Sequence, residues 1–310
     1  MNRSCLINKL ASKITTMATK REFTTVGIMG KPDNPAVAET AGILYQFLLK
    51  KVTHVLVEEL IADGMSSKPE HTVTRDQIGL KCDLVIVVGG DGSMLNAGRL
   101  LANYDVPVLG INRGYLGFLT DIRPKEMVEK VASVIDGNYI EEKRFLLFAR
   151  VNRDTIPAGE SEALNDIVLY PGEISKMLEF EVYIDDQFAF SQRSDGIIVS
   201  TPTGSTAYAL SGGGPIMHPH LDAVVLVPMN AHTLSARPIV VDINSCIDIV
   251  VAKSNPHNPQ ISCDGQLTIP IKPGDKISIR KKKRQLWLLH PADHDYYRVL
   301  RSKLRWGSKL

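Results

Sequence analysis

The first half of the chain alternates short apolar runs with amphipathic stretches of helical spacing. Buried strands of a parallel sheet read as continuous apolar runs, and the helices that cover them repeat apolar residues every three or four positions. The predicted strands are Thr25–Met29, Val55–Val57, Leu84–Val88 and Val106–Ile111, and the predicted helices are Pro35–Lys51, one capped by Ser93, and Pro124–Ile135. This order predicts an α/β domain with a parallel sheet, whose ligands bind beyond the carboxyl ends of the strands.

Two features of the first helix follow from its ends and its spacing. Asn34 is expected to cap it, with Pro35 at its first position. Its expected apolar face consists of Val37, Ile43, Leu44, Phe47 and Leu48.

From about residue 144 the pattern changes to short stretches in which apolar and polar residues alternate. Such alternation predicts strands with one buried face, and Asp185-Asp186 reads as a hairpin turn. The predicted strands are Leu178–Ile184, Phe188–Ser191, Val224–Val227, Ile239–Val241, Ile247–Val251 and Lys276–Ile279. This half is therefore expected to be mostly β and sandwich-like, and the basic run Lys281–Arg284 is interpreted as a solvated hairpin turn.

These changes of pattern divide the chain into four parts. Residues 1–22 are interpreted as a disordered extension, 23–143 as the α/β domain and 144–285 as the mostly β domain. Residues 286–310, with a helical pattern over Tyr296–Trp306, are expected to return to the first domain.

Composition excludes several classes of function. A net charge of +2 lacks the concentrated basic face of a nucleic-acid-binding protein, so no nucleic-acid partner is expected. No apolar stretch approaches the ~20 residues that a membrane span needs. The four cysteines have neither metal-ligand spacing nor a disulfide framework, and Cys82 and Cys246 adjoin apolar runs as buried thiols would. A cytoplasmic protein without a membrane partner or a metal-ligating motif is expected.

The most informative stretch joins the strand Leu84–Val88 to a helix through Gly89-Gly90-Asp91-Gly92. Glycines allow a sharp turn and close approach of a ligand, and the start of the helix favours phosphate. Asp91 would repel phosphate, so a loop built only to hold phosphate would not contain it. Its presence fits proton abstraction from a hydroxyl group, or coordination of Mg²⁺.

Three further motifs lie downstream. Residues 195–215 read DGIIVSTPTGSTAYALSGGGP, a turn so rich in hydroxyl groups that it is expected to present donors and acceptors to a flat polar ligand. Asn165-Asp166 precedes an apolar run, and Asp264-Gly265-Gln266 follows Cys263.

In their order and content these four motifs resemble those of the NAD kinase family, of the bacterial ATP-NAD type, over roughly residues 24–300. The resemblance implies an α/β domain like those of phosphofructokinases and diacylglycerol kinases, followed by a β-sandwich-like NAD-binding domain. It implies transfer of the ATP γ-phosphoryl group to the 2′-hydroxyl of the adenosine ribose of NAD, with Mg²⁺ or another divalent cation. It also implies a homo-oligomer, a tetramer or a dimer.

Residues that match the family's motifs are assigned roles through this resemblance. Asp91 would be the catalytic base. The expected substrate- and nucleotide-binding residues are Gly90, Gly92, Asn165, Asp166, Lys176, Arg193, Asp195, Thr206, Ala207, Tyr208, Ser211 and Gln266. Asp166 stands where the family usually has Glu, which leaves its hydrogen bond open. A charged residue at position 193 accompanies strict use of ATP in the family.

Two other functions share part of this signature. A lipid kinase has the Gly-Gly-Asp-Gly loop, but the hydroxyl-rich turn Thr201–Ser211 is more polar than an apolar acceptor site would be. A catalytically silent NAD-sensing module would lack the acidic residue of the loop, and Asp91 is present.

Overall fold

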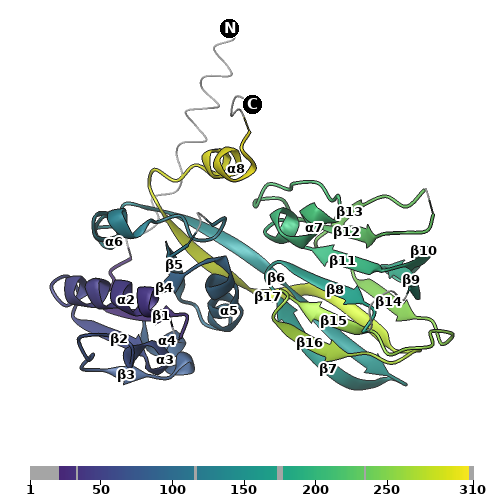
Figure 1. The fold of residues 1–310 in the computed structure, drawn as a ribbon, viewed down its shortest axis with the longest axis horizontal. Coiled ribbons are helices and arrows are strands. Elements are labelled where there is room, and N and C mark those ends of the chain that lie inside the picture. The colour runs from purple at the N-terminus through teal and green to yellow at the C-terminus, as the bar shows by residue number, and fades with distance from the viewer. Residues whose placement is uncertain (1–20, 33, 115–116, 173–176, 234, 307–310) are drawn as a thin grey trace, which may run out of the picture.

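The computed structural model describes residues 21–32, 34–114, 117–172, 177–233 and 235–306. Lys176 and residues 1–20 of the expected extension lie outside them. Figure 1 shows two lobes side by side, joined by a pair of long strands that crosses from one to the other. The helix near the carboxyl end lies above the junction.

The first lobe is the predicted α/β domain with a parallel sheet. Its strands run in the order β3–β2–β1–β4–β5, all parallel. They are β1 (Thr25–Gly30), β2 (His54–Glu58), β3 (Thr72–Val73), β4 (Leu84–Gly89) and β5 (Pro107–Asn112). The helices are α2 (Pro35–Leu48), α3 (Glu59–Ala62), α4 (Arg75–Lys81), α5 (Asp91–Leu101) and α6 (Met127–Ile135), the last preceded by the 3₁₀ turn η1 (Pro124–Glu126).

Helices cover both faces of this sheet, as its continuous apolar strands require. One apolar core packs α2, α3 and α6 against it, with Ile28, Leu44 and Val131 fully buried. The opposite core packs α4 and α5 against it, with Ile78 and Met94 fully buried. The sheet therefore presents its strand ends, and not its faces, to ligands.

Two local expectations for this lobe are wrong. Asn34 does cap α2, but Ile43 is 52% exposed because it lies on the solvent side of a helix that rests on the sheet with one face. Ser93 is not a cap. The helix α5 begins two residues earlier, at Asp91, because Gly90 takes the extended cap conformation (φ −100°, ψ −172°). Asp91 therefore occupies the first turn of the helix.

The second lobe is the predicted β-sandwich. One layer is a six-stranded antiparallel sheet in the order β13–β12–β11–β8–β15–β16. These strands are β8 (Asp166–Tyr170), β11 (Gly196–Ser200), β12 (Ala223–Met229), β13 (Ile239–Asp242), β15 (Gln260–Cys263) and β16 (Leu267–Pro270). The other layer consists of β6 (Tyr139–Arg153), β7 (Ile156–Ala163), β9 (Leu178–Ile184), β10 (Gln187–Ser194), β14 (Ile247–Val251) and β17 (Lys276–Pro291).

The inner faces of both layers form one core that includes Phe180, Ile197 and Ile277. Three short elements complete the described chain: the 3₁₀ turn η2 (Gly204–Thr206), α7 (Tyr208–Ser211) and α8 (Tyr296–Leu304). No helix within the described ranges is long and apolar enough to cross a membrane.

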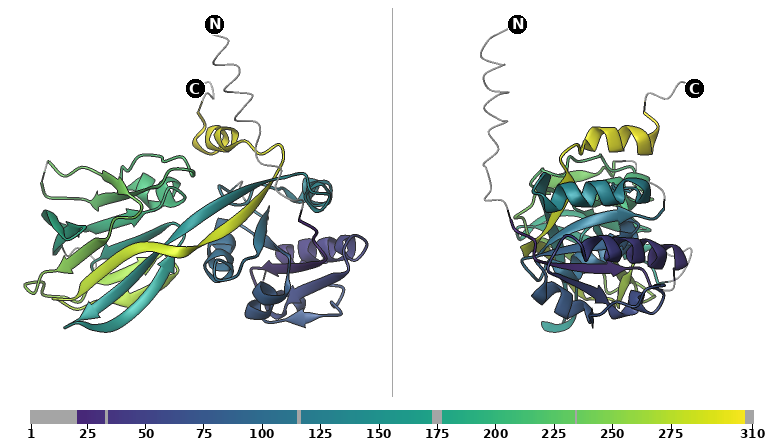
Figure 2. Two further views of the ribbon diagram at one scale, coloured as in Figure 1. Left: turned by 180° about the vertical axis from the view of Figure 1, so that it is seen from behind. Right: turned by 90° about the vertical axis from the view of Figure 1, so that its left-hand side faces the viewer.

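The long antiparallel pair β6–β17 makes one continuous sheet of the two lobes. Its pairing runs from Tyr139 opposite Pro291 to Asn152 opposite Lys276. At one end β17 pairs in parallel with β5 of the first lobe, and at the other end it pairs antiparallel with β14 of the sandwich. Figure 2 shows the two strands crossing between the lobes from behind.

This pair overturns the interpretation of Lys281–Arg284 as a hairpin turn. The four residues lie within β17, where the register shifts between Lys281 and Gln285. A bulge accommodates extra residues in one strand while the neighbouring ladder continues. The strands also run through residues 143 and 285, where domain boundaries were predicted.

Candidate active site

Asp91 lies at the start of α5, and both of its carboxylate oxygens are held by the loop that follows β5. The backbone N–H of Phe118 donates to Oδ2 at 2.8 Å, and the backbone N–H of Leu119 donates to Oδ1 at 3.1 Å. The Thr120 hydroxyl lies 3.2 Å from Oδ1. These contacts fix the carboxylate in one orientation. A Cβ at Gly117 would lie 1.9 Å from Oδ1, so only glycine fits there.

Asp264 is the centre of a buried network that joins the two lobes. Its carboxylate accepts backbone N–H bonds from Leu164 (3.0 Å), Asn165 (2.7 Å) and Asp166 (3.3 Å). Arg99 on α5 donates to the same carboxylate at 2.6 Å. Asp264 therefore ties the start of β8 to the helix that carries Asp91.

Gln266 extends this network to the glycine-rich turn. Its side-chain oxygen accepts from Arg99 at 2.6 Å, and its nitrogen donates to the Gly92 carbonyl at 2.9 Å. Sequence reasoning predicted Gln266 but missed Arg99, which is 7% exposed. A lone arginine in an amphipathic helix gives no signal of burial, because its partner lies 165 residues away.

Two cavities adjoin this network. The first, here the Asn165 cavity, has a volume of about 840 Å³. It is lined by Asn165, Asp166, Val168, Tyr170, Pro171, Gly172, Asp195, Ala207, Tyr208, Met229, Ser262, Asp264 and Gly265. Five residues that were predicted from distant motifs therefore line one cavity: Asn165, Asp166, Asp195, Ala207 and Tyr208.

The second, here the Gly92 cavity, has a volume of about 720 Å³ and lies beyond the carboxyl ends of β1 and β4. It is lined by Met29, Gly30, Lys31, Pro32, Leu60, Arg75, Val87, Gly90, Gly92, Ser93, Asn96, Ala97 and Gln266. The predicted residues Gly90, Gly92 and Gln266 lie here. The turn 264–266 contributes to both cavities.

Asp166 has an unusual electrostatic environment in the Asn165 cavity. It is 4% exposed, and burial together with the nearby charge of Asp264 raises its pKa to about 7. Because burial disfavours the charged form, this carboxyl group stays protonated at mildly acidic pH. It can then donate a hydrogen bond as well as accept one.

The raised pKa of Asp166 predicts a pH-dependent effect of Asp166→Asn on stability. The folded protein binds the proton of the Asp166 carboxyl group more tightly than the unfolded chain does, because an Asp in the unfolded chain has a pKa of about 3.9. Wild-type stability therefore falls relative to Asp166→Asn as pH rises from about 4 to 7, by roughly 1–3 kcal/mol, and the difference is constant above that range. Urea unfolding of both proteins at pH 5 and pH 8 measures it. A difference in stability between the two proteins that did not change with pH would contradict the raised pKa of Asp166.

The hydroxyl-rich turn has a different role from the one expected. Ser200, Thr201 and Ser205 are fully buried, and their hydroxyls bond to backbone groups. The Thr201 hydroxyl donates to the Leu164 carbonyl at 2.6 Å, and a Cβ at Gly204 would lie 2.2 Å from the Asn165 carbonyl oxygen. These residues build the wall that holds Asn165 in place. Of the hydroxyl-bearing residues of this turn only Tyr208 lines the cavity, together with Ala207.

Four predicted residues within the described ranges line neither cavity, and Asp91, held by the loop after β5, is one of them. The Thr206 hydroxyl bonds to the Thr203 carbonyl at 3.3 Å, and Ser211 is exposed at the end of α7. Arg193 is exposed on β10, where it lies 3.8 Å from Glu179. Lys176 falls outside the described residues.

The sequence matches known protein families over most of its length. Models of the ATP-NAD kinase N-terminal and C-terminal domains match residues 26–139 and 164–290. The NAD kinases of Pseudomonas entomophila (strain L48) and Pseudomonas syringae pv. syringae (strain B728a) are each 57% identical over 289 residues, which cover 93% of this chain and 98% of the relative.

Two solved kinase structures have the same fold as this chain. Yeast NADH kinase complexed with NADH superposes with a TM-score of 0.82 at 27% identity, covering 94% of this chain and 90% of that one. An NAD kinase from Archaeoglobus fulgidus in complex with ATP has a TM-score of 0.70 at 23% identity, covering 91% and 99%, and supports the fold. The chain therefore belongs to the ATP-NAD kinase family, and it transfers a phosphoryl group from ATP to NAD to give NADP.

Proposed function

We propose that NAD binds in the Asn165 cavity, that ATP binds in the Gly92 cavity, and that Asp91 is the general base between them. The observation that supports this arrangement is the turn 264–266, which contributes to both cavities and bonds to Gly92 beside Asp91. Phosphoryl transfer depends mainly on position and electrostatics, and two adjoining cavities meet that need.

The acceptor side rests on polar groups that suit an adenosine ribose. Asn165 offers donors and acceptors, and Asp166 can bond to the ribose hydroxyl groups. Asp195, which accepts from Asn230 at 2.8 Å, lies on the same wall. Tyr208 is 45% exposed at the cavity and can lie against a flat ring.

The donor side rests on cationic and backbone groups. Lys31 lines the Gly92 cavity, as does Arg75, which contacts Glu58 and Asn96. The helix α5 begins after Gly90 without a side-chain cap, so no capping side chain accepts hydrogen bonds from its first backbone N–H groups. Such a helix start favours phosphate.

A divalent cation fits this donor side. Mg²⁺ usually keeps several waters and is held by one or two carboxylates together with substrate phosphates. The described residues that line the Gly92 cavity include no Asp or Glu, so such a cation would be held mainly by triphosphate oxygens and water. When bound, Mg²⁺ would neutralise the charge of the triphosphate. Asp91 itself orients the 2′-hydroxyl group and receives its proton during transfer, as the fixed carboxylate allows.

Two variants test which cavity takes which substrate. Lys31→Met should raise the KM for ATP at least about fivefold, and Asn165→Ala should do the same for NAD, because each removes contacts to one ligand. Each variant should leave the other KM within about twofold. Lys50→Met, an exposed lysine beyond α2, is the matched control. The reverse pattern would exchange the two cavities, and no change in either KM would refute the assignment.

The donor range carries a separate prediction. In the family a charged residue at position 193 accompanies strict ATP use, so polyphosphate should serve poorly or not at all. Arg193 lines neither cavity, so any such effect would act through its exposed position on β10. NADP formation is compared with equal phosphate equivalents of ATP and polyphosphate. Comparable rates would show that Arg193 does not restrict the donor.

The protein is also expected to form a homo-oligomer, a tetramer or a dimer. The sandwich sheet ends on β13, where Ile239 and Val240 are 39% and 50% exposed, and exposed edge strands favour pairing. Light scattering at micromolar concentration should give a multiple of 34.2 kDa. A mass near that of one chain would contradict it.

The free cysteine thiols support the proposed cytoplasmic location. Cys82 and Cys263 are buried and unpaired, whereas Cys246, predicted to be buried, is only partly so. Burial raises the pKa of Cys82 to about 12, which keeps that thiol protonated and unreactive. Unpaired thiols of this kind suit a reducing compartment.

A further inference from the structure

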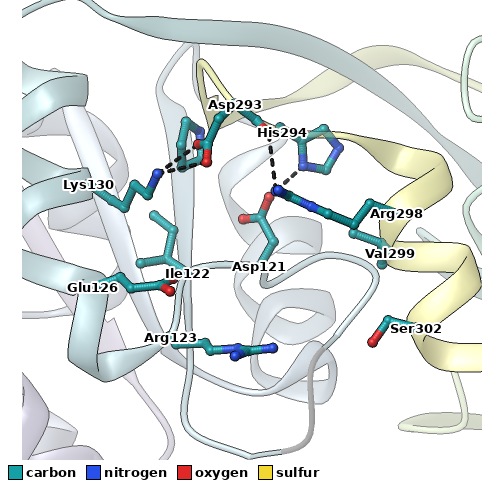
Figure 3. Close-up of a pocket in the computed structure, with 11 residues that line it drawn as sticks. Asp121, Ile122, Arg123, Glu126, Lys130, Asp293, His294, Arg298, Val299 and Ser302 are labelled. Carbon is teal, nitrogen blue, oxygen red and sulfur yellow. Dashed lines mark hydrogen bonds and ion pairs between the residues drawn. The ribbon is translucent and has the colours of Figure 1, made fainter.

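A cluster of histidine and carboxylate side chains lies apart from both substrate cavities. The carboxylate of Asp121 lies 3.3 Å from His290 Nδ1 and 2.5 Å from His294 Nδ1. His290 is the next-to-last residue of β17, and His294 lies in the segment before α8. In Figure 3, Asp121 and His294 lie next to each other to the right of the ion pair of Lys130 with Asp293, and all four residues line a pocket of about 290 Å³.

The cluster continues into a buried chain of charged side chains. His290 Nε2 lies 3.2 Å from Glu142 Oε2 on the paired strand β6. Glu142 accepts from Arg144 at 2.6 Å, and its other oxygen lies 3.1 Å from His220. Arg144 in turn donates to the Thr203 hydroxyl at 3.1 Å. His290, Glu142, Arg144 and Thr203 are 2%, 9%, 4% and 8% exposed, so these four side chains are buried, and water reaches the group at the exposed His220.

Charge balance favours a protonated imidazole at its centre. Burial alone would lower the pKa of His290, but the contacts with Asp121 and Glu142 outweigh burial and raise it. The pKa of Asp121 is held well below its usual range, because its contacts with His290 and His294 outweigh the effect of burial. An imidazolium group between two carboxylates is favoured by charge on both sides, although His290 Nε2 is close to Glu142 without being aligned for a hydrogen bond.

The two histidine rings are stacked on each other beside Asp121. Their ring centroids lie 4.0 Å apart at an interplanar angle of 25°, which is a stacked pair. Both rings direct Nδ1 at the same oxygen, Asp121 Oδ2, so one carboxylate oxygen holds the stacked pair. Asp121, His290 and His294 therefore form one compact unit, and Zn²⁺ binding by this unit is the alternative that the experiment below tests.

The two ends of this series of contacting side chains lie next to Asp91 and to the Asn165 cavity. Asp121 directly follows Thr120, whose hydroxyl lies 3.2 Å from Asp91. Asn112 also holds Thr120, by donating to its carbonyl at 3.0 Å. At the other end, Thr203 directly precedes η2, which leads to Ala207 and Tyr208 in the Asn165 cavity.

We propose that His290 is a positioning residue, which holds the loop 117–121 that orients Asp91 at a fixed distance from the turn 203–208 of the Asn165 cavity. This rests on the proposed roles of Asp91 and of that cavity. His290 touches neither substrate cavity; it acts through Asp121 on one side and through Glu142 and Arg144 on the other. Misplacing a base relative to its substrate by about 1 Å costs on the order of 10²-fold in rate.

Kinetics of His290→Gln tests the proposal, because glutamine keeps a polar side chain but removes the imidazolium charge. We expect kcat to fall by about 10- to 100-fold, with the KM values for NAD and ATP within about threefold of wild type. Asp121→Asn should act similarly, and the double variant should lose no more than the larger single loss, because both break the same chain. Lys130→Met, which removes the neighbouring ion pair with Asp293, is the matched control and should keep wild-type kcat.

Three results would overturn the proposal: a kcat of His290→Gln equal to that of the control, losses that multiply in the double variant, or tight Zn²⁺ binding by the wild type in calorimetry that His290→Gln abolishes. Thr203→Val breaks the chain at its far end, and should lower kcat as well if His290→Gln does not fold. Asp91→Asn is measured in parallel. Full turnover by that variant would refute the role of Asp91, whereas non-multiplying losses at His290 and Asp121 would still show that these two side chains act together.

Discussion

Asp91→Asn is expected to fold and to bind NAD, but to lose at least about 10²-fold in kcat, the lower end for removal of a general base. The change is nearly isosteric. An amide cannot take the proton of the 2′-hydroxyl group, and it has one oxygen with which to accept the bonds that Phe118 and Leu119 now donate to two. Steady-state formation of NADP measures the loss.

Thr120→Val provides the matched control for this prediction. It removes the hydroxyl beside Asp91 but leaves the carboxylate and both backbone bonds. The kcat of Thr120→Val should fall by less than about tenfold, because the base itself remains. Circular dichroism of both variants checks the fold. Wild-type turnover by Asp91→Asn would show that Asp91 only holds the loop.

Arg99→Leu should destabilise the protein by about 3–5 kcal/mol, the usual loss when one partner of a buried ion pair is removed. Arg99 and Asp264 have side chains that are 8% and 0% exposed, and no other cation is shown to contact Asp264 in the described part of the chain. The remaining carboxylate would stay buried with backbone N–H donors alone. Urea unfolding monitored by fluorescence measures the change.

The matched control for Arg99→Leu is Arg150→Leu. Arg150 also forms an ion pair, with Glu160, but the two side chains are 49% and 43% exposed. An exposed pair contributes about 0–1 kcal/mol, so this variant should remain close to wild type. Equal losses for the two variants would show that burial of the Arg99 pair carries no special cost.

Sequence reasoning succeeded where a single short segment determines its own environment. Strands such as Leu84–Gly89 are buried on both faces, and a continuous apolar run records that directly. The hairpin turn at Asp185-Asp186 was also predicted correctly, since both residues adopt positive φ, which aspartate tolerates. The Asn165 cavity could be predicted because its residues lie in motifs that are recognisable one at a time.

It failed where a segment depends on distant partners. Strand β17 passes from one lobe to the other, so its exposure changes along its length, and Lys281–Arg284 reads as a turn. The start of α5 was misplaced because a glycine cap leaves no side-chain signal. The Arg99–Asp264 and Asp121–His290 contacts each join residues more than 160 positions apart, and no local pattern encodes them.

The long pair β6–β17 has a consequence for how this enzyme can be divided. Each strand begins in one lobe and ends in the other, so a cut near residue 143 or 285 would leave both fragments with half a strand and an open row of backbone donors and acceptors. The two lobes are thus not interchangeable modules. Co-expressed fragments cut there should regain activity only by reassembling on one another, and neither should yield a well-folded protein alone.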